Sequence, residues 1–384
     1  MSIQSEIDRI ITAVGSAYDA VESKGGTAPA AQTIGGLATA VGTIPTGIAP
    51  QLIVTVSAGA TVTATNGSKT ISGTADSTGV CTLIVPEAGT WSVSATLGGQ
   101  TSDTKTVSIT DSYSLTLSFV SSTLNNNEWS VIKSVSDAGQ GANYWSIGDR
   151  KAVTLNGTVG QLSLSNYTTY AFIIGFNHNA SVEGTNRIHF QLAKTALSGG
   201  KDVCFCDNQY GPDSGWSSPG AGYFVMNASN TNSGGWKSSQ MRTNICGTSL
   251  SSYSGTIIAV IPAALRAVLK SVTKYTDNTG NNSTSASAVT ATTDYFFLLS
   301  EFEVFGSISY GNENEKNKQA QYAYYSAGNS KIKYKHNGTS TDAYWWLRSP
   351  YASNSGIFVG VGAGGTVGNG YASFSLGFAP GFCV

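Results

Sequence analysis

The chain ends in a long segment that carries almost no charge. Arg348 is the last charged residue, and the rest of the sequence to Val384 consists of apolar, aromatic, small and short polar residues. Disordered tails are rich in charge and poor in aromatic residues, so this composition excludes an ordinary solvated tail. The segment is instead typical of a surface that a rigid apolar frame holds open for recognition. The residues expected to form this frame are Trp345, Trp346, Leu347 and Arg348, with Arg348 fixing the turn through backbone carbonyls.

The whole chain shares this low charge. Only 11% of its 384 residues are charged, against roughly 25% in an average soluble protein. It contains 45 glycines and many serines, threonines and asparagines, which favours a β-rich extracellular or virion protein over a cytosolic enzyme. The net charge of −1 gives no electrostatic reason to expect nucleic acid or an anionic membrane as a partner.

No targeting segment is recognisable. The first ten residues, MSIQSEIDRI, lack the basic and apolar regions of a signal peptide. No run of 18 apolar residues occurs, so we expect no membrane insertion. We therefore expect synthesis in the cytoplasm of a host, with release by virion assembly or lysis.

The five cysteines are scattered and lack metal-binding spacing. They are Cys81, Cys204, Cys206, Cys246 and Cys383. Buried free thiols are the favoured interpretation, and one disulfide that involves Cys204 or Cys246 is the alternative.

The N-terminus predicts a helix that associates with copies of itself. Apolar residues recur with heptad spacing at Ile3, Ile7, Ile10, Val14, Ala17 and Val21. Isoleucine at both seam positions favours three or four strands, and we predict a coiled-coil trimerisation and attachment segment over residues 1–46. The alternative is an amphipathic helix that lies on its own domain. A second short helix is expected over residues 31–44, and Pro45 and Pro50 mark a linker.

Residues 51–120 change to a period of two. Seven short alternating runs, separated by glycine, Asn-Gly and aspartate turns, predict a small antiparallel β-sandwich. The stretch GVCTLIVPEAGTWSVSATLGG resembles the immunoglobulin-like or prealbumin-like spacer domains of surface proteins, with Trp91 in the core.

Residues 125–384 predict a mixed α+β domain. Strands are expected in AVTLNG, YAFIIGFNHN, RIHFQLAK and DYFFLLSEFEVFG. Helices are expected over residues 257–274, where Pro262 lies near the first turn, and over residues 314–326.

Six motifs in this region together resemble a C-type-lectin-like domain family. They are NYWSIGDRKAVTLNG, FIIGFNHN, GGWKSSQMR, IPAALRAVLKSVTK, DYFFLLSEFEVFG and YWWLRSP…APGF. The family occurs at the C-termini of phage tail-fibre tips and of related bacterial proteins. In fold it is related to the variable proteins of diversity-generating retroelements, such as the phage major tropism determinant. The resemblance implies a ligand-binding domain with no established catalytic residues.

The resemblance also implies a variable segment over residues 351–378. Relatives are often rich in asparagine here, and retroelement mutation of asparagine codons cannot produce Lys, Glu, Gln, Trp or Met. None of these five types occurs in the segment, although plain divergence is the alternative. The candidate ligand-binding residues are Tyr351, Gly356, Ile357, Gly360, Gly362, Ala363, Gly368, Gly370, Tyr371, Ser373, Phe374 and Leu376.

Side-chain chemistry supports the same segment. Aromatic residues among glycine and serine are typical of binding loops, because they bring large rigid contact area at small entropic cost. The residues expected to be exposed are Tyr351, Ile357, Tyr371, Phe374 and Leu376. Phe358, Val359, Val361 and Val367 are expected to include core residues.

Signs of catalysis or metal binding are few. His178 and His189 could approach each other across strands, but no acidic residue lies beside either at ligand spacing, so structural roles are expected for both and for His336. Glu301 and Glu303 alternate on an expected strand and could act as a glycosidase pair, but the same pattern fits a strand with one solvated face. We expect no catalytic residues, no cofactor and metal-independent binding.

The sequence therefore predicts a mainly β, multidomain receptor-binding protein at the tip of a phage tail fibre. Its expected partners are a host cell-surface protein or glycan, other tail proteins and two further copies of the chain. The alternatives are a bacterial surface adhesin with the same module, a polysaccharide hydrolase and a structural virion protein.

Overall fold

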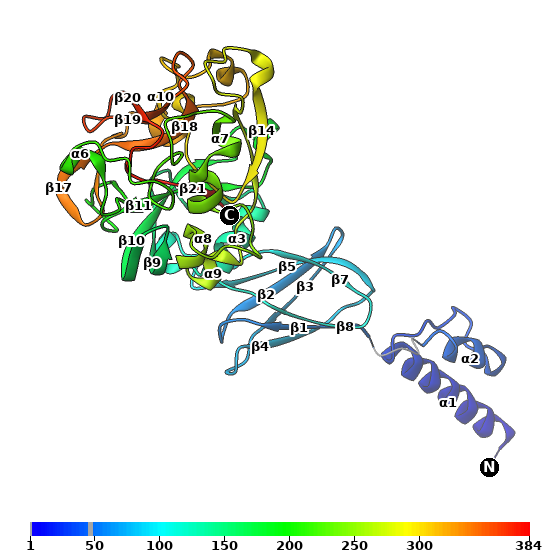
Figure 1. The fold of residues 1–384 in the computed structure, drawn as a ribbon. Helices are drawn as coiled ribbons and strands as arrows, with labels where there is room; N and C mark the ends of the chain where they lie inside the picture. The colour runs from blue at the N-terminus through cyan, green and yellow to red at the C-terminus, as the bar shows by residue number, and fades with distance from the viewer. Residues whose placement is uncertain (1, 45–48) are drawn as a thin grey trace. The chain divides into compact units, whose positions relative to one another are not determined.

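The structure is a computed structural model that describes residues 2–44 and 49–384. It is mainly β, with several sheets and an N-terminal helix, and it divides into two compact units, Met1–Phe119 and Val120–Val384 (Figure 1). Pro45, expected in the linker, lies outside the described residues, whereas Pro50 directly precedes the first strand.

Unit 1 begins with two helices that pack on each other. Helix α1 (Ile3–Ser23) is capped by Ser2, and α2 (Ile34–Val41) by Thr33. Tyr18 and Val21 are buried against α2, and the Tyr18 hydroxyl donates a hydrogen bond of 2.8 Å to the Thr33 carbonyl. The N-terminal half of the predicted seam, Ile3, Ile7 and Ile10, is exposed, because α2 covers only the C-terminal part of α1. No helix in the described part of the chain combines the length and apolar character needed to cross a bilayer.

The rest of unit 1 consists of short strands in two sheets. One sheet has the order β4-β1-β8, and the other has the order β3-β2-β5-β6 with β7 also paired to β5. Strand β1 pairs with β8 in parallel, so the prediction of a purely antiparallel arrangement is wrong. Alternate side chains of β1 and β5 are buried, and Trp91 lies fully inside this core. The strands are β1 (Gln51–Thr55), β2 (Thr61–Asn66), β3 (Lys69–Thr74), β4 (Val80–Ile84), β5 (Gly89–Leu97), β6 (Gln100–Thr101), β7 (Lys105–Ile109) and β8 (Ser112–Thr116).

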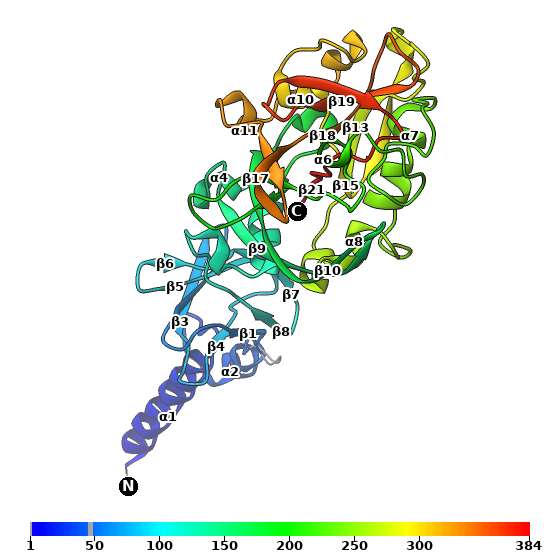
Figure 2. The ribbon, with the colours of Figure 1, turned by 60° about the vertical axis from the view of Figure 1, so that its left-hand side comes forward.

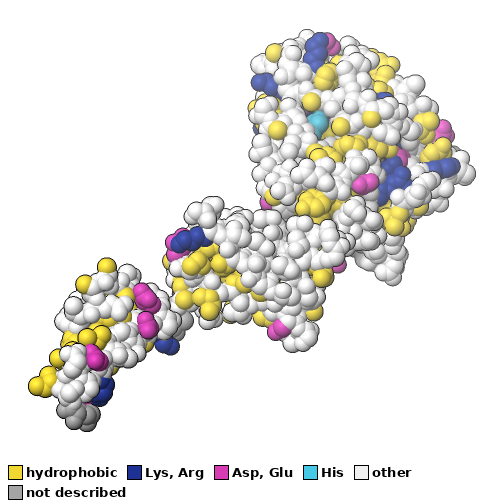
Figure 3. All heavy atoms as spheres, turned by 180° about the vertical axis from the view of Figure 1, so that it is seen from behind, with side chains coloured by type: hydrophobic (Ala, Val, Ile, Leu, Met, Phe, Trp, Pro, Cys, Tyr) yellow, Lys and Arg dark blue, Asp and Glu magenta, His cyan; other side chains and the backbone are white. Residues whose placement is uncertain are grey.

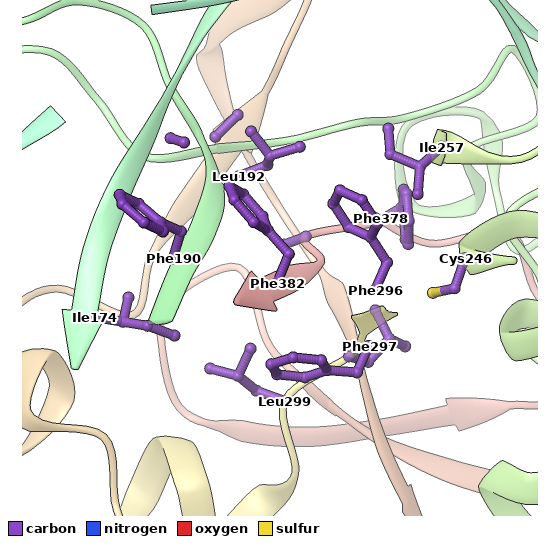
Figure 4. Close-up of a cluster of buried hydrophobic side chains, with 14 of the residues drawn as sticks. Ile174, Phe190, Leu192, Cys246, Ile257, Phe296, Phe297, Leu299, Phe378 and Phe382 are labelled. Atoms are coloured by element: carbon purple, nitrogen blue, oxygen red, sulfur yellow. The ribbon is translucent and has the colours of Figure 1, made fainter. Parts of the chain in front are cut away.

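Unit 2 is built around a sheet of the order β15-β21-β11-β10-β9. The C-terminal strand β21 pairs with both β11 and β15, so the end of the chain lies inside the sheet. Phe190 and Phe382 stack at 5.2 Å between ring centroids in the aromatic core beneath (Figure 4). The strands are β9 (Arg150–Val159), β10 (Leu162–Phe176), β11 (Ile188–Lys194), β15 (Phe296–Phe297) and β21 (Gly381–Cys383).

Three smaller sheets complete unit 2. Figures 1 and 2 show the β18-β19-β20 sheet at the end of the unit opposite to β9 and β10. The remaining strands are β12 (Val203–Cys204), β13 (Val272–Asp277), β14 (Val289–Asp294), β16 (Lys333–Lys335), β17 (Gly338–Ala343), β18 (Trp345–Pro350), β19 (Ile357–Val361) and β20 (Val367–Tyr371).

The helical segments of unit 2 are short. The α-helices are α3 (Trp129–Asp137), α4 (Gly141–Tyr144), α5 (Ala180–Glu183), α6 (Gly211–Ser214), α7 (Gly235–Ser238), α8 (Ile257–Val260), α9 (Ala263–Arg266), α10 (Glu301–Phe305) and α11 (Ala323–Ser326). A π-helical segment covers Met241–Cys246, and the 3-10 segments are Leu124–Asn126, Ala286–Ala288 and Glu313–Asn317.

Three sequence predictions for unit 2 are wrong in their element type. Residues 257–274 form α8, α9 and the start of β13 rather than one helix, because Pro262 has an extended backbone and precedes α9. Residues 314–326 form a 3-10 turn and α11 separated by extended chain. The strand expected over residues 294–306 is reduced to the two residues of β15, and α10 follows it.

Candidate ligand-binding surface

The predicted frame residues lie on β18 and are buried. Every side chain of this strand, Arg348 included, is inaccessible to solvent. The Trp345 indole donates a hydrogen bond to the Lys331 carbonyl, and the Trp346 indole donates one to the Phe224 carbonyl. Both buried indole N–H groups therefore have a hydrogen-bond acceptor. The buried and hydrogen-bonded tryptophans make β18 a rigid support for β19 and β20.

Arg348 is held by a carboxylate as well as by carbonyl groups. Its guanidinium forms a two-pronged ion pair with Glu303, at 2.5 and 2.9 Å, and donates to the Leu298 carbonyl at 2.8 Å. Burial acts to raise the pKa of Glu303, but the charges of Arg348 and Lys274 outweigh it and hold this pKa well below its usual value. The network joins β18 to α10 and β13. Arg348 therefore connects three elements, whereas the sequence predicted that it fixes a single turn.

The position of Glu301 and Glu303 does not suit a glycosidase pair. Both side chains are fully buried on α10, so the expected solvated strand face is wrong. The Glu301 carboxylate accepts hydrogen bonds from the backbone N–H groups of Ser309, Tyr310 and Gly311. Glu303 completes a capping box with Ser300. Both carboxylates therefore stabilise local structure.

An exposed row of aromatic side chains lies beside this frame. Tyr371, at the end of β20, contacts Phe374 edge to face at 5.3 Å, and Phe374 stacks on Trp216 at 5.1 Å with 25° between the ring planes. Trp216 in turn meets Tyr344 edge to face at 5.5 Å. Trp216 is 50% exposed and Tyr371 is 44% exposed. We call these four residues the aromatic ridge. Each ring holds the next, so the ridge presents its exposed faces with little freedom to move.

Half of the ridge was not predicted from the sequence. Tyr371 and Phe374 were predicted, whereas Trp216 and Tyr344 were not. A usable signal was present, because residues 216–236 contain no charged side chain, as do residues 349–384. Backbone hydrogen bonds link these two segments, including Asn227 to Ala372 and Leu376 to Phe224. Figure 3, which shows one face of the molecule, likewise has only scattered charged side chains on unit 2.

The loop between β18 and β19 is held through its backbone. Asn232 is fully buried, and its amide nitrogen donates to the carbonyl oxygens of Tyr351, Asn354 and Ile357 at 3.2, 2.9 and 2.9 Å. The Asn232 side-chain oxygen accepts from the Asn281 N–H. These contacts do not depend on which side chains the loop carries, so the loop can keep its path when its side chains change.

Several predicted ligand-binding residues are buried instead of exposed. Leu376 is only 1% exposed, because its backbone pairs with Phe224 and directs the side chain into the core. Ser373 is also buried, and its hydroxyl donates a hydrogen bond to Asn230. The expected exposure of Leu376 is therefore wrong, and Ser373 offers little accessible surface to a ligand.

Four of the predicted glycines serve close packing. Gly356, Gly360, Gly362 and Gly370 are buried. An added Cβ at Gly360 would lie 3.0 Å from the Trp345 carbonyl, and one at Gly370 would lie 3.0 Å from the Trp346 ring. A larger residue at either position would crowd these tryptophans, so glycine lets the strands approach them closely.

The remaining candidates keep partial exposure. Tyr351, Ile357, Ala363 and Gly368 are half-buried, and the Tyr351 ring lies 5.0 Å from that of Tyr310. Phe358, Val359 and Val361 are buried, as expected for core residues, whereas Val367 is half-buried.

The histidines lie in two different environments. Glu183 lies beside both His178 and His189, so the prediction that no acidic residue accompanies them is wrong. The chain connection between β10 and β11 brings these three together. Burial lowers the pKa of His189 well below its usual value, and it lowers that of His336, next to Cys206, to about 4. All five cysteines are buried and free.

The comparisons with known proteins cover only part of the chain. A family model described as a domain of unknown function (DUF6273) matches residues 223–384. The match includes β18–β20 and three ridge residues, while Trp216 precedes it. No curated protein matches the chain.

Proposed function

We propose that this chain is a receptor-binding protein of a phage tail-fibre tip and that the aromatic ridge attaches it to the host cell surface. The observation that carries the proposal is the row of packed aromatic rings of Trp216, Phe374 and Tyr371, in which Trp216 and Tyr371 are about half exposed. Isolated exposed aromatic residues are ordinary, whereas pre-organised rows of tyrosine and tryptophan are typical of binding hot spots.

The finer architecture follows the same proposal. Unit 2 is a C-type-lectin-like domain, the sandwich of unit 1 is an immunoglobulin-like or prealbumin-like spacer, and α1 assembles three chains. The backbone contacts of Asn232 support a segment that a retroelement diversifies, because they leave the side chains of Tyr351, Asn354 and Ile357 free to vary.

The chemistry of the ridge defines its ligand in part. Three of the four ridge residues come from residues 216–236 and 349–384, and neither segment contains a charged side chain. Recognition therefore depends on stacking and on hydrogen bonds between uncharged groups. The partners are a protein or glycan of the host surface and the other proteins of the tail. No step of this function requires a catalytic residue.

The test is binding of the fluorescently labelled full chain to a panel of bacterial strains. Trp216→Ala and Tyr371→Ala are each expected to weaken binding at least about tenfold, since a hot-spot aromatic residue contributes about 2 kcal/mol or more. The thermal unfolding of unit 2 should change little, because both side chains are half-exposed.

The matched control is Tyr113→Ala. Tyr113 is a comparably exposed aromatic residue on β8 of the spacer, so its loss should leave binding unchanged. Undiminished binding of the ridge variants to the strains that bind the wild-type chain would contradict the proposal.

A further inference from the structure

A buried group of two imidazoles and a carboxylate lies at the connection between β10 and β11. His178 precedes α5, Glu183 ends it, and His189 lies on β11. One ring nitrogen of each histidine and one carboxylate oxygen of Glu183 all lie within 4.8 Å of one another. None of the three residues is more than 7% exposed. Asn177 and Asn179 take positive φ angles in the turn that brings His178 back toward β11.

The hydrogen bonds of His178 leave its Nδ1, a hydrogen-bond acceptor, facing a carboxylate oxygen that is also an acceptor. Its Nε2 lies 2.9 Å from the Ala320 carbonyl oxygen, which can only accept, so Nε2 carries the hydrogen. In the neutral ring, Nδ1 is then a bare acceptor. It lies 3.2 Å from Glu183 Oε1, a second acceptor, and makes no hydrogen bond to any described residue. Two facing lone pairs repel each other, so this geometry calls for a cation between them.

Lys274 is not that cation. Its ammonium group donates to Glu183 Oε2 at 2.7 Å, to Glu303 Oε1 at 3.0 Å and to the Tyr322 hydroxyl at 2.8 Å. These three acceptors account for all three N–H bonds of a lysine. Lys274 therefore neutralises one side of Glu183 and leaves Oε1 turned toward His178.

His189 closes the other side of the group. Its Nδ1 lies 3.7 Å from Glu183 Oε2 and 3.2 Å from both the Tyr322 hydroxyl and the Cys383 sulfur, so a metal ion would have to displace the Tyr322 contact. Its Nε2 has no partner among the described residues. Two imidazoles and a carboxylate are thus enclosed by protein. The Cys383 thiol lies beside them and could serve as a fourth metal ligand.

We propose that His178, Glu183 and His189 bind a divalent transition-metal ion of the zinc type. Bonds of about 2.0–2.2 Å to nitrogen and oxygen place two ligands of a tetrahedral ion about 3.3 Å apart, close to the spacing of His178 Nδ1 and Glu183 Oε1. The other donor pairs are up to 4.8 Å apart and would have to close by up to about 1.5 Å. Imidazole donors select zinc and its neighbours over calcium, which prefers oxygen ligands. The ion would fasten the β10–β11 connection and act in stability rather than in ligand recognition.

The first measurement is the metal content of the full chain. The protein is produced in zinc-supplemented medium and also refolded with zinc, then desalted and analysed by elemental mass spectrometry. About one zinc ion per chain is expected from both routes, as is the visible absorption of tetrahedral cobalt after refolding with Co²⁺. Less than about a tenth of an ion per chain from both routes would overturn the proposal and leave a proton as the bridging cation.

Variants assign the ligands. His178→Gln and Glu183→Gln should each lower zinc affinity at least about tenfold. His336→Gln is the matched control, because His336 is also buried but binds the Cys206 N–H elsewhere in unit 2. Equal zinc content in all three variants would place the metal elsewhere and overturn the assignment. If a ligand variant does not fold, the metal content of the wild-type chain still decides the proposal.

Discussion

Glu315 is a carboxylic acid in a place where ionisation is unfavourable. It is fully buried, and burial raises its pKa to about 7 although it accepts hydrogen bonds from the Asp277 N–H and the Ser349 hydroxyl. Its ordinary value is 4.5, so between pH 4.5 and 7 the folded state holds a proton that the unfolded state has released. The contribution of Glu315 to the free energy of unfolding is therefore largest below pH 4.5, falls as the pH rises and is constant above pH 7.

The variant Glu315→Gln should remove this dependence. From pH 4.5 to 7 the stability of the wild type should fall relative to the variant by up to about 3 kcal/mol, because each pKa unit corresponds to about 1.4 kcal/mol. The measurement is urea denaturation of both chains across this range. His336, whose lowered pKa acts in the opposite direction, is present in both chains and cancels in the difference. A difference that is independent of pH would refute the assignment of this proton to Glu315.

At the scale of single elements, Asn232 is the residue on which the loop before β19 depends most. Replacing it with alanine would leave the carbonyl groups of Tyr351, Asn354 and Ile357 without their amide partner. Buried acceptors left unsatisfied cost about 1–3 kcal/mol, so Asn232→Ala should loosen the loop locally.

Hydrogen–deuterium exchange can resolve this local effect. Peptides that cover residues 351–357 should exchange faster in Asn232→Ala, because the Tyr351 N–H to Ile357 carbonyl bond opens more often. Asn329→Ala is a suitable control, since the Asn329 amide donates its hydrogen bond to the Tyr324 carbonyl on α11, away from this loop. Unchanged exchange in 351–357 would mean that the loop holds its shape without the amide.

The strands of unit 1, the strands β9, β10 and β11 and the N-terminal helix could be predicted from sequence, because alternation and heptad spacing indicate which side chains are buried. The same patterns failed for residues 257–274. Their apolar residues are buried as the helical period requires, but the chain turns twice, and Arg266 stabilises the turns by donating to the carbonyls of Ile258, Ala259 and Ile261. A periodic pattern contains no information about such a side-chain contact.

The short helix α10 was predictable in principle. Ser300 and Glu303 have the spacing of a capping box, which marks a helix start, whereas the alternation of Glu301 with Phe302 suggested a strand. For the candidate ligand-binding surface, the sequence predicted Tyr371 and Phe374 but wrongly predicted that Leu376 is exposed. A one-residue change in the pairing of a segment reverses which side chains are exposed, and only coordinates determine that pairing. The Trp216–Phe374 stack joins residues too distant in the chain for any local pattern.

For the molecule as a whole, the exposed apolar face of α1 is the main unexplained surface. Ile3 is 83% exposed, Ile7 44% and Ile10 45%. Ile10 also lines an open groove of about 340 Å³ that runs between α1 and α2. A single chain does not cover this face within its helical segment, and contiguous exposed apolar surface marks an interaction site. With the heptad spacing of these isoleucines, the expected partner is two further copies of the same helix.

The expected consequence is a change of mass on substitution. Light scattering coupled to size-exclusion chromatography should give about three times the chain mass of 39.7 kDa for the wild type. The triple variant Ile3→Gln, Ile7→Gln, Ile10→Gln should give the mass of one chain, because glutamine keeps the helix propensity but removes the apolar seam. If the chain attaches to cells, the loss of multivalency should also weaken this attachment about 10²–10⁴-fold. Unit 2 should remain folded in the variant.

Ile84→Gln separates this effect from a general loss of apolar surface. Ile84 is 66% exposed on β4 of unit 1, outside any heptad pattern, so its replacement should leave the mass at three chains. A wild-type chain that elutes with the mass of one copy at micromolar concentration would show that α1 does not trimerise by itself. In that case the proposed self-association of α1 would be wrong, and its exposed isoleucines would require a different partner.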